Sequence, residues 1–67
     1  MISITVNGER REIEGPTTIA GFLENHGLHD RIVVVEHNGE IVPRHQYSEV
    51  ILADGQTLEI VQMMAGG

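Results

Sequence analysis

The sequence predicts an α+β fold in which one mixed β-sheet packs against a single helix. Segments with alternating apolar and polar residues stand at the start and near the end of the chain. Asn-Gly and Asp-Gly pairs, which favour tight hairpin turns, follow or separate the strand-like segments. One stretch near residue 20 has apolar residues at helical spacing. A lone amphipathic helix needs one sheet face to cover, which is the two-layer arrangement.

Length and composition restrict the class of protein. A chain of 67 residues forms one domain with a modest core. It contains no cysteine, which excludes disulfides, thiolate metal sites and a cysteine nucleophile. The missing disulfides favour the cytosol, and the first residues do not resemble a signal peptide. No apolar run approaches the roughly 20 residues that cross a bilayer. We therefore expect a cytoplasmic protein with no membrane segment.

The charge indicates which partners are excluded. The formal net charge is −6, all four basic residues are arginines, and there is no lysine. An acidic surface repels nucleic acid and anionic membranes, so neither is expected as a partner. The charge suits a protein partner with a basic docking face, or it only keeps the domain in solution.

The first third of the chain predicts a hairpin followed by a helix. Residues 2–6 alternate as a half-buried strand, and Asn7-Gly8 suits a type I′ turn. The return strand, residues 9–14, is so charged that it belongs at a sheet edge. After a break at Gly15-Pro16, Thr17 or Thr18 caps a helix that ends at Gly27. The apolar stripe of this helix consists of Ile19, Phe22, Leu23 and His26.

The remainder predicts three further strands. Residues 32–35 are an unbroken β-branched run, typical of a strand covered on both faces or nearly so. Asn38-Gly39 forms a second hairpin turn, which leads to a short strand at residues 41–42. Residues 44–53 are expected to be irregular or briefly helical. Residues 57–64 form the last strand. This order fits a β-grasp (ubiquitin-like) fold with a four- to five-stranded mixed sheet.

The end of the chain is its most informative feature. We expect a β-grasp domain over residues 1–64 and a flexible tail of Ala65, Gly66 and Gly67. Glycine has no Cβ, so two glycines make a thin thread that enters a narrow enzyme channel. The thread ends in a carboxylate, which needs activation, for instance by adenylation, before it takes part in acyl transfer. A diglycine alone is a weak signal, but directly after the last strand of a β-grasp it is more specific.

Nearly the whole sequence resembles the thiamine-biosynthesis sulfur carrier family, ThiS. The stretches that carry the resemblance are VNGE, TTIAGFLENHGL, IVVVEHNGEIVPR and ADGQTLEIVQMMAGG. The resemblance implies a protein co-substrate, not an enzyme. It implies that an E1-like adenylating enzyme activates the Gly67 carboxylate with ATP and that a thiocarboxylate follows. The sulfur would come from a donor such as a cysteine desulfurase and pass to thiazole synthase. No cofactor is expected on the chain itself, since ATP would bind the partner.

A carrier used by several enzymes needs a docking face. If Leu58 and Ile60 enter the core, Val61 and Met63 lie on the open face of the sheet and form a contact patch. Arg44, after Pro43, either binds a carboxylate on a partner, caps local carbonyls, or pairs with Glu40 or Glu49. Scattered surface apolar residues are the plainer interpretation of the patch.

Four histidines do not predict a metal site, because Gly27 should separate His26 from His29. Three other functions remain open. The molybdopterin synthase small subunit also ends in a diglycine on a β-grasp domain. A ubiquitin-like protein modifier would form isopeptide bonds with lysines of other proteins. A non-covalent ubiquitin-like module would not use the tail.

Overall fold

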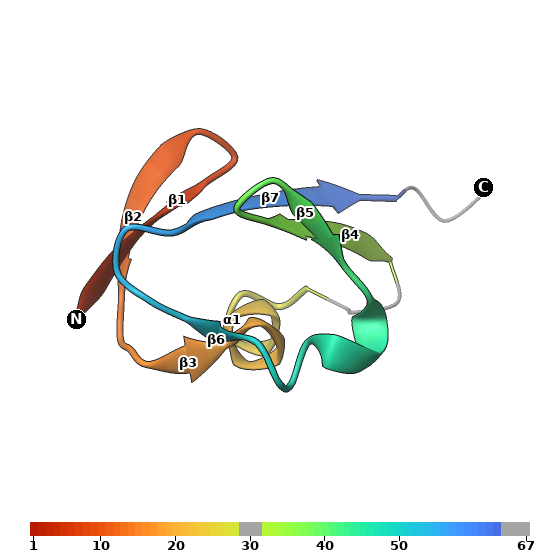
Figure 1. The fold of residues 1–67 in the computed structure, drawn as a ribbon, viewed down its shortest axis with the longest axis horizontal. Helices are drawn as coiled ribbons and strands as arrows, with labels where there is room; N and C mark the ends of the chain where they lie inside the picture. The colour runs from red at the N-terminus through yellow and green to blue at the C-terminus, as the bar shows by residue number, and fades with distance from the viewer. Residues whose placement is uncertain (29–31, 64–67) are drawn as a thin grey trace.

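A computed structural model of the chain describes residues 1–28 and 32–63. A five-stranded mixed sheet, in the order β2-β1-β7-β4-β5, carries one helix on one of its faces (Figure 1). A second, two-stranded sheet pairs β3 with β6. This confirms the predicted fold class. The elements are β1 Ile2–Val6, β2 Glu9–Ile13, β3 Thr17–Thr18, α1 Ile19–Asn25, β4 Val33–His37, β5 Glu40–Val42, the 3₁₀ turn η1 Arg44–Gln46, β6 Ile51–Leu52 and β7 Thr57–Gln62.

Both predicted asparagine-glycine hairpins form. Asn7 and Asn38 have φ of 51°, and the glycines that follow them also have positive φ, as a type I′ turn requires. The charged strand β2 lies at the edge of the sheet beside β1, which confirms its predicted place.

Helix α1 begins where the sequence predicts. The Oγ1 of Thr18 accepts a hydrogen bond of 3.0 Å from the N–H of Gly21. The N–H groups of Ile19 and Ala20 donate to carbonyls of the segment after η1, at 3.0 and 2.8 Å. The first turn therefore leaves none of these three donors without a partner. Gly27, with φ of 69°, follows the last turn, which confirms the predicted stop.

Two local predictions need correction. Residues 44–53 contain the brief helix η1, as expected, but also the strand β6. This strand pairs with β3, the strand that directly precedes α1 in the chain. A two-residue strand carries no periodic signal, so the sequence pattern missed it. Strand β4 is buried on one face and partly covered on the other: Val33 and Val35 are buried, whereas Val34 is half-buried. The β-branched run therefore reflects strand propensity as well as burial, and the second face is less covered than the pattern predicts.

The core lies between α1 and the helix-facing side of the large sheet. Each fully buried aliphatic or aromatic side chain contributes about 1.5–3 kcal/mol relative to exposure. Among the described residues the buried hydrophobic side chains are Ile4, Val6, Ile19, Phe22, Leu23, Val33, Val35, Val42, Tyr47, Leu52 and Leu58.

Strand β7 occupies the centre of the large sheet, and both hairpin asparagines bind it. Asn38 Oδ1 accepts from the N–H of Thr57 at 2.9 Å, at the start of β7. Asn7 Oδ1 accepts from the N–H of Ile60 at 2.7 Å, and Asn7 Nδ2 donates to the Ile60 carbonyl at 3.1 Å. The side-chain amide of Asn7 thus takes the place of a neighbouring strand beyond the end of β1.

This arrangement predicts unequal effects of two otherwise similar substitutions. Asn7→Gly and Asn38→Gly both suit a positive φ, so each turn survives. Asn7→Gly removes two side-chain hydrogen bonds to β7, and we expect a loss of about 1–2 kcal/mol in unfolding free energy. Asn38→Gly removes one and should cost about half as much. Urea unfolding measures both, and an Asn7→Gly variant as stable as the unmodified chain contradicts the assigned role.

Candidate functional site

The described part of the chain ends one residue beyond β7, the central strand of the large sheet. The N–H of Met63, one residue beyond β7, donates to the carbonyl of Ile32 at 2.6 Å, so the backbone follows β4 up to this point. The predicted tail residues Ala65, Gly66 and Gly67 lie outside the described residues, as does Met64. The structure establishes that the last described residue, Met63, follows directly on β7.

The predicted division of β7 between two faces is confirmed. Leu58 is fully buried and Ile60 is half-buried against the core. Val61 and Met63 face the other way and keep 59% and 50% of their surface exposed. Alternation along the strand therefore leaves two apolar side chains on the open face, immediately before the chain end.

Two neighbouring strands enlarge this apolar surface. Val34 of β4 lies directly opposite Val61. Ile41 of β5, which is 69% exposed, lies opposite Glu36, two residues along β4 from Val34. Directly paired residues share a sheet face, so these side chains lie on one surface. We call it the open-face patch: Val34, Ile41, Val61 and Met63. Sequence reasoning missed Val34 and Ile41, because the sheet face on which each lies depends on the register between strands.

An acidic pair borders the open-face patch. Glu36 of β4 and Glu59 of β7 lie directly opposite each other. Like charges at directly opposed positions repel each other. A cationic group from outside the chain would relieve that repulsion. This surface therefore combines an apolar centre with a negative border, the complement of a basic docking face.

Arg44 lies apart from these residues, in the exposed 3₁₀ turn η1. Neither Glu40 nor Glu49 forms an ion pair with it, since the ion pair recorded within residues 1–28 and 32–63 joins Arg11 to Glu9. Two of the local roles expected for Arg44 are thus not seen. The structure also does not bring it together with Val61 or Met63, so its functional role stays a prediction.

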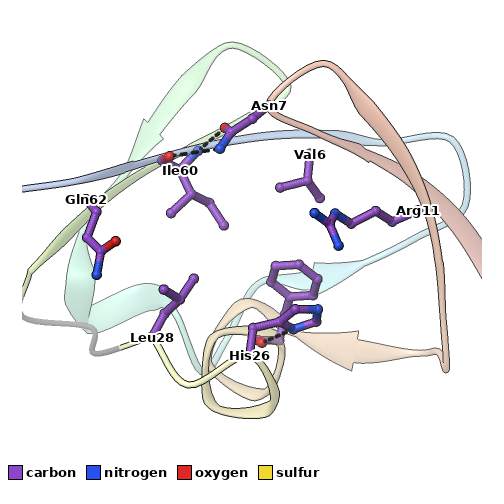
Figure 2. A pocket seen from close by; sticks show the side chains of 8 residues that line it. Val6, Asn7, Arg11, His26, Leu28, Ile60 and Gln62 are labelled. Carbon is purple, nitrogen blue, oxygen red and sulfur yellow. Dashed lines mark hydrogen bonds between the residues drawn. The ribbon is translucent and has the colours of Figure 1, made fainter.

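A hollow of about 190 Å³ lies on the other side of the sheet, between β7, the first hairpin and the end of α1. Figure 2 shows Arg11 on one side of it, Leu28 and Gln62 on the other, and the imidazole of His26 at the bottom of the view. Phe22 also lines the hollow. The His26 ring lies 4.2 Å from that of Phe22, and its Nδ1 lies 2.9 Å from the Phe22 carbonyl oxygen. His26, placed in the apolar stripe by its spacing, is exposed.

The described part of the chain shows neither a metal-binding cluster nor a membrane-spanning helix. There, no three histidine or acidic side chains gather as a metal site would require. His29, the other half of the pair considered from sequence, lies outside that part. Within the same residues, α1 and η1 are too short to cross a bilayer as helices.

Comparison with solved structures identifies the same fold in another protein. The crystal structure of a thiamine biosynthesis protein (ThiS) from Geobacter metallireducens superposes with a TM-score of 0.84 at 28% identity. The match covers 98% of this chain and 100% of that one. A solution structure of a thiamine biosynthesis protein from the same organism matches with a TM-score of 0.82, over 88% of its length.

Curated relatives fall into two groups. A sulfur carrier protein ThiS from Bacillus subtilis is 42% identical over 50 residues, 75% of this chain and 76% of that protein. A thiazole synthase from Paramagnetospirillum magneticum is 39% identical over 66 residues, and one from Magnetococcus marinus is 35% identical. The chain spans about a fifth of the length of these two thiazole synthases. A model of the ThiS family matches residues 4–67. The chain therefore belongs to the ThiS family.

Proposed function

We propose that this chain is a sulfur carrier of thiamine biosynthesis and a protein co-substrate, not an enzyme. The match of residues 4–67 to the ThiS family carries the proposal. The sulfur-carrier relative from Bacillus subtilis and the thiamine-biosynthesis structures point to the same pathway and favour it over molybdopterin synthesis or protein modification.

The proposed chemistry takes place on the carboxylate of Gly67. An E1-like enzyme joins this carboxylate to the AMP portion of ATP and releases pyrophosphate. AMP is then a good leaving group, and a persulfide on the donor displaces it to form an acyl disulfide. A second thiol reduces that disulfide, which releases the thiocarboxylate and leaves a disulfide between the two thiols. The sulfur comes from cysteine through a donor such as a cysteine desulfurase, and thiazole synthase accepts it. In this scheme ATP binds the activating enzyme, and the carrier contributes the position of its reactive atom.

The proposed tail of Ala65, Gly66 and Gly67 continues from the central strand of the sheet. Pairing with β4 on one side and with β1 and Asn7 on the other holds β7 in place up to Ile60. A tail attached to a fixed strand starts from a defined point on the domain surface. That favours insertion into a narrow site while the folded domain docks outside it.

The first experiment measures the intact mass of the natural protein and then of the purified chain after incubation. The proposal requires the natural protein to end at Gly67. With the activating enzyme, ATP and a sulfur donor, the chain should gain ~16 Da, one sulfur in place of one oxygen at the activated acyl group. Omission of ATP, or deletion of Gly67, should abolish this gain. A natural protein that continues past Gly67, or a gain that survives the deletion, contradicts the proposal.

We also propose that the open-face patch docks the adenylating enzyme. The patch lies beside the chain end that the enzyme must reach, and Glu36 and Glu59 at its border suit a basic surface. Methionine, as at position 63, adapts to more than one partner. Arg44, away from the patch, is proposed as a secondary contact that binds a partner carboxylate.

A matched pair of substitutions tests this docking. Val61 and Ile51 are equally exposed, at 59% and 60%, but Ile51 belongs to β6 and not to the large sheet. Val61→Asp should lower kcat/KM for adenylation by about tenfold or more, as expected for a central contact. Ile51→Asp adds the same charge elsewhere and should change it less than about twofold. Equal losses in both variants would point to general charge repulsion and refute docking through the patch.

A further inference from the structure

The hydrogen bonds of β7 show which edge each of its residues faces. Successive residues in a strand direct their backbone N–H and C=O to opposite sides. Thr57 bonds to Asn38, and the next residue after β7, Met63, bonds to Ile32, so odd-numbered positions face β4. Leu58 and Ile60 bond to Asn7, so even-numbered positions face β1.

Gln62 therefore directs its backbone N–H and C=O toward the β1 side, where none of the strands in the described part of the chain accompanies it. Pairing of β1 with β7 ends at Val6 and Leu58. The Asn7 side chain satisfies Ile60, and within residues 1–28 and 32–63 no recorded hydrogen bond reaches the backbone of Gln62 from this side. Such an edge accepts an added strand.

The hollow lies directly beside this free edge, since Asn7, Ile60 and Gln62 all line it. Its walls are apolar at Phe22 and at Leu28, the latter labelled in Figure 2. Its charged group is the guanidinium of Arg11, a residue opposite Ile4 and therefore on the helix-facing side of β2.

Arg11 is available to a further anion. Its Nη2 lies 3.4 Å from Glu9 Oε1, with 48% and 73% of the two side chains exposed. A solvated pair of this kind is held weakly, and an incoming carboxylate can form a closer, bidentate contact with the guanidinium. An acidic side chain with an apolar stem suits both the walls and the charge of the hollow.

We propose that an extended segment of thiazole synthase adds as a strand to the free edge of β7 at Gln62 and places an acidic side chain in the hollow against Arg11. The identity of the partner rests on the proposed function. The two thiazole synthase relatives support it, because each carries a region similar to this chain within one polypeptide. A second copy of the chain is a poorer occupant, since each copy has a net charge of −6.

Two variants at one position test strand addition. Gln62→Pro removes the N–H that faces the free edge, whereas the N–H groups facing β4 belong to odd-numbered residues and remain. Gln62→Ala removes the side chain and keeps the N–H. Both variants lack the Gln62 side chain, which lines the hollow, so the comparison between them isolates the N–H. Calorimetric titration with thiazole synthase should give a Kd at least about tenfold higher for Gln62→Pro than for Gln62→Ala.

A second pair tests the charge in the hollow and does not depend on proline. Arg11→Gln and Arg10→Gln remove the same charge from adjacent residues of β2. Arg10, opposite Thr5, faces the other side, where its Nε donates to Ser3 Oγ at 2.8 Å. Arg11→Gln should raise the Kd about tenfold, as for loss of a charge-assisted hydrogen bond, and Arg10→Gln should leave it nearly unchanged.

The outcomes separate this proposal from the proposed function. Unchanged binding by a folded Gln62→Pro variant, or equal effects of the two arginine changes, overturns strand addition at this edge. If Gln62→Pro does not fold, the comparison of Arg11→Gln with Arg10→Gln tests the proposal by itself. Absence of binding to thiazole synthase, or a dimer of the chain that Gln62→Pro abolishes, also overturns it. A normal gain of ~16 Da on sulfur loading alongside these results leaves the carrier function intact, whereas no gain refutes that function instead.

Discussion

The pairing of β7 with β4 is the interaction on which the rest of the structure depends. It joins residues far apart in sequence, from Val33 opposite Gln62 to His37 opposite Leu58, and places the last strand in the middle of the large sheet. On the opposite side, β1 accompanies β7 only to Leu58, and the side chain of Asn7 extends that support to Ile60. The strand nearest the chain end is thus among the most firmly held, although a chain end commonly frays.

Because of this placement, the two faces of β7 and its free edge have different surroundings. Leu58 faces α1 and is part of the core, so substitutions there act on stability. Val61 and Met63 are on the opposite face, where substitution costs little folding energy and leaves them free to meet a partner. The backbone N–H and C=O of Gln62 lie in the plane of the sheet and point out from the free edge of β7. A chain of 67 residues therefore has two surfaces that we propose as contact sites, next to the segment that we propose carries the chemistry.

Local sequence signals predicted much of this fold, because each rests on near-neighbour physics. Asn7-Gly8 and Asn38-Gly39 require only turn geometry, and Thr18 caps α1 through a residue three positions away. What sequence could not supply depends on long-range register. The β3–β6 pair, the pairing of Val34 with Val61 and the hydrogen bonds from Asn7 to Ile60 all join segments distant in sequence. The proposed reactive group, the carboxylate of Gly67, was inferred from the diglycine that follows the last strand, and it stays a prediction because residues 64–67 lie outside the described part of the chain.

Amide hydrogen exchange along β7 tests the central claim most directly: this strand is held on both sides only up to Ile60, and its edge is free beyond that point. The amides of Ile60 and Met63, bonded to Asn7 and Ile32, should exchange slowly in the free chain. The amide of Gln62, between them, should exchange at close to the rate of an unstructured peptide. Protection of Gln62 equal to that of its neighbours would contradict the account, because the edge would then already be covered.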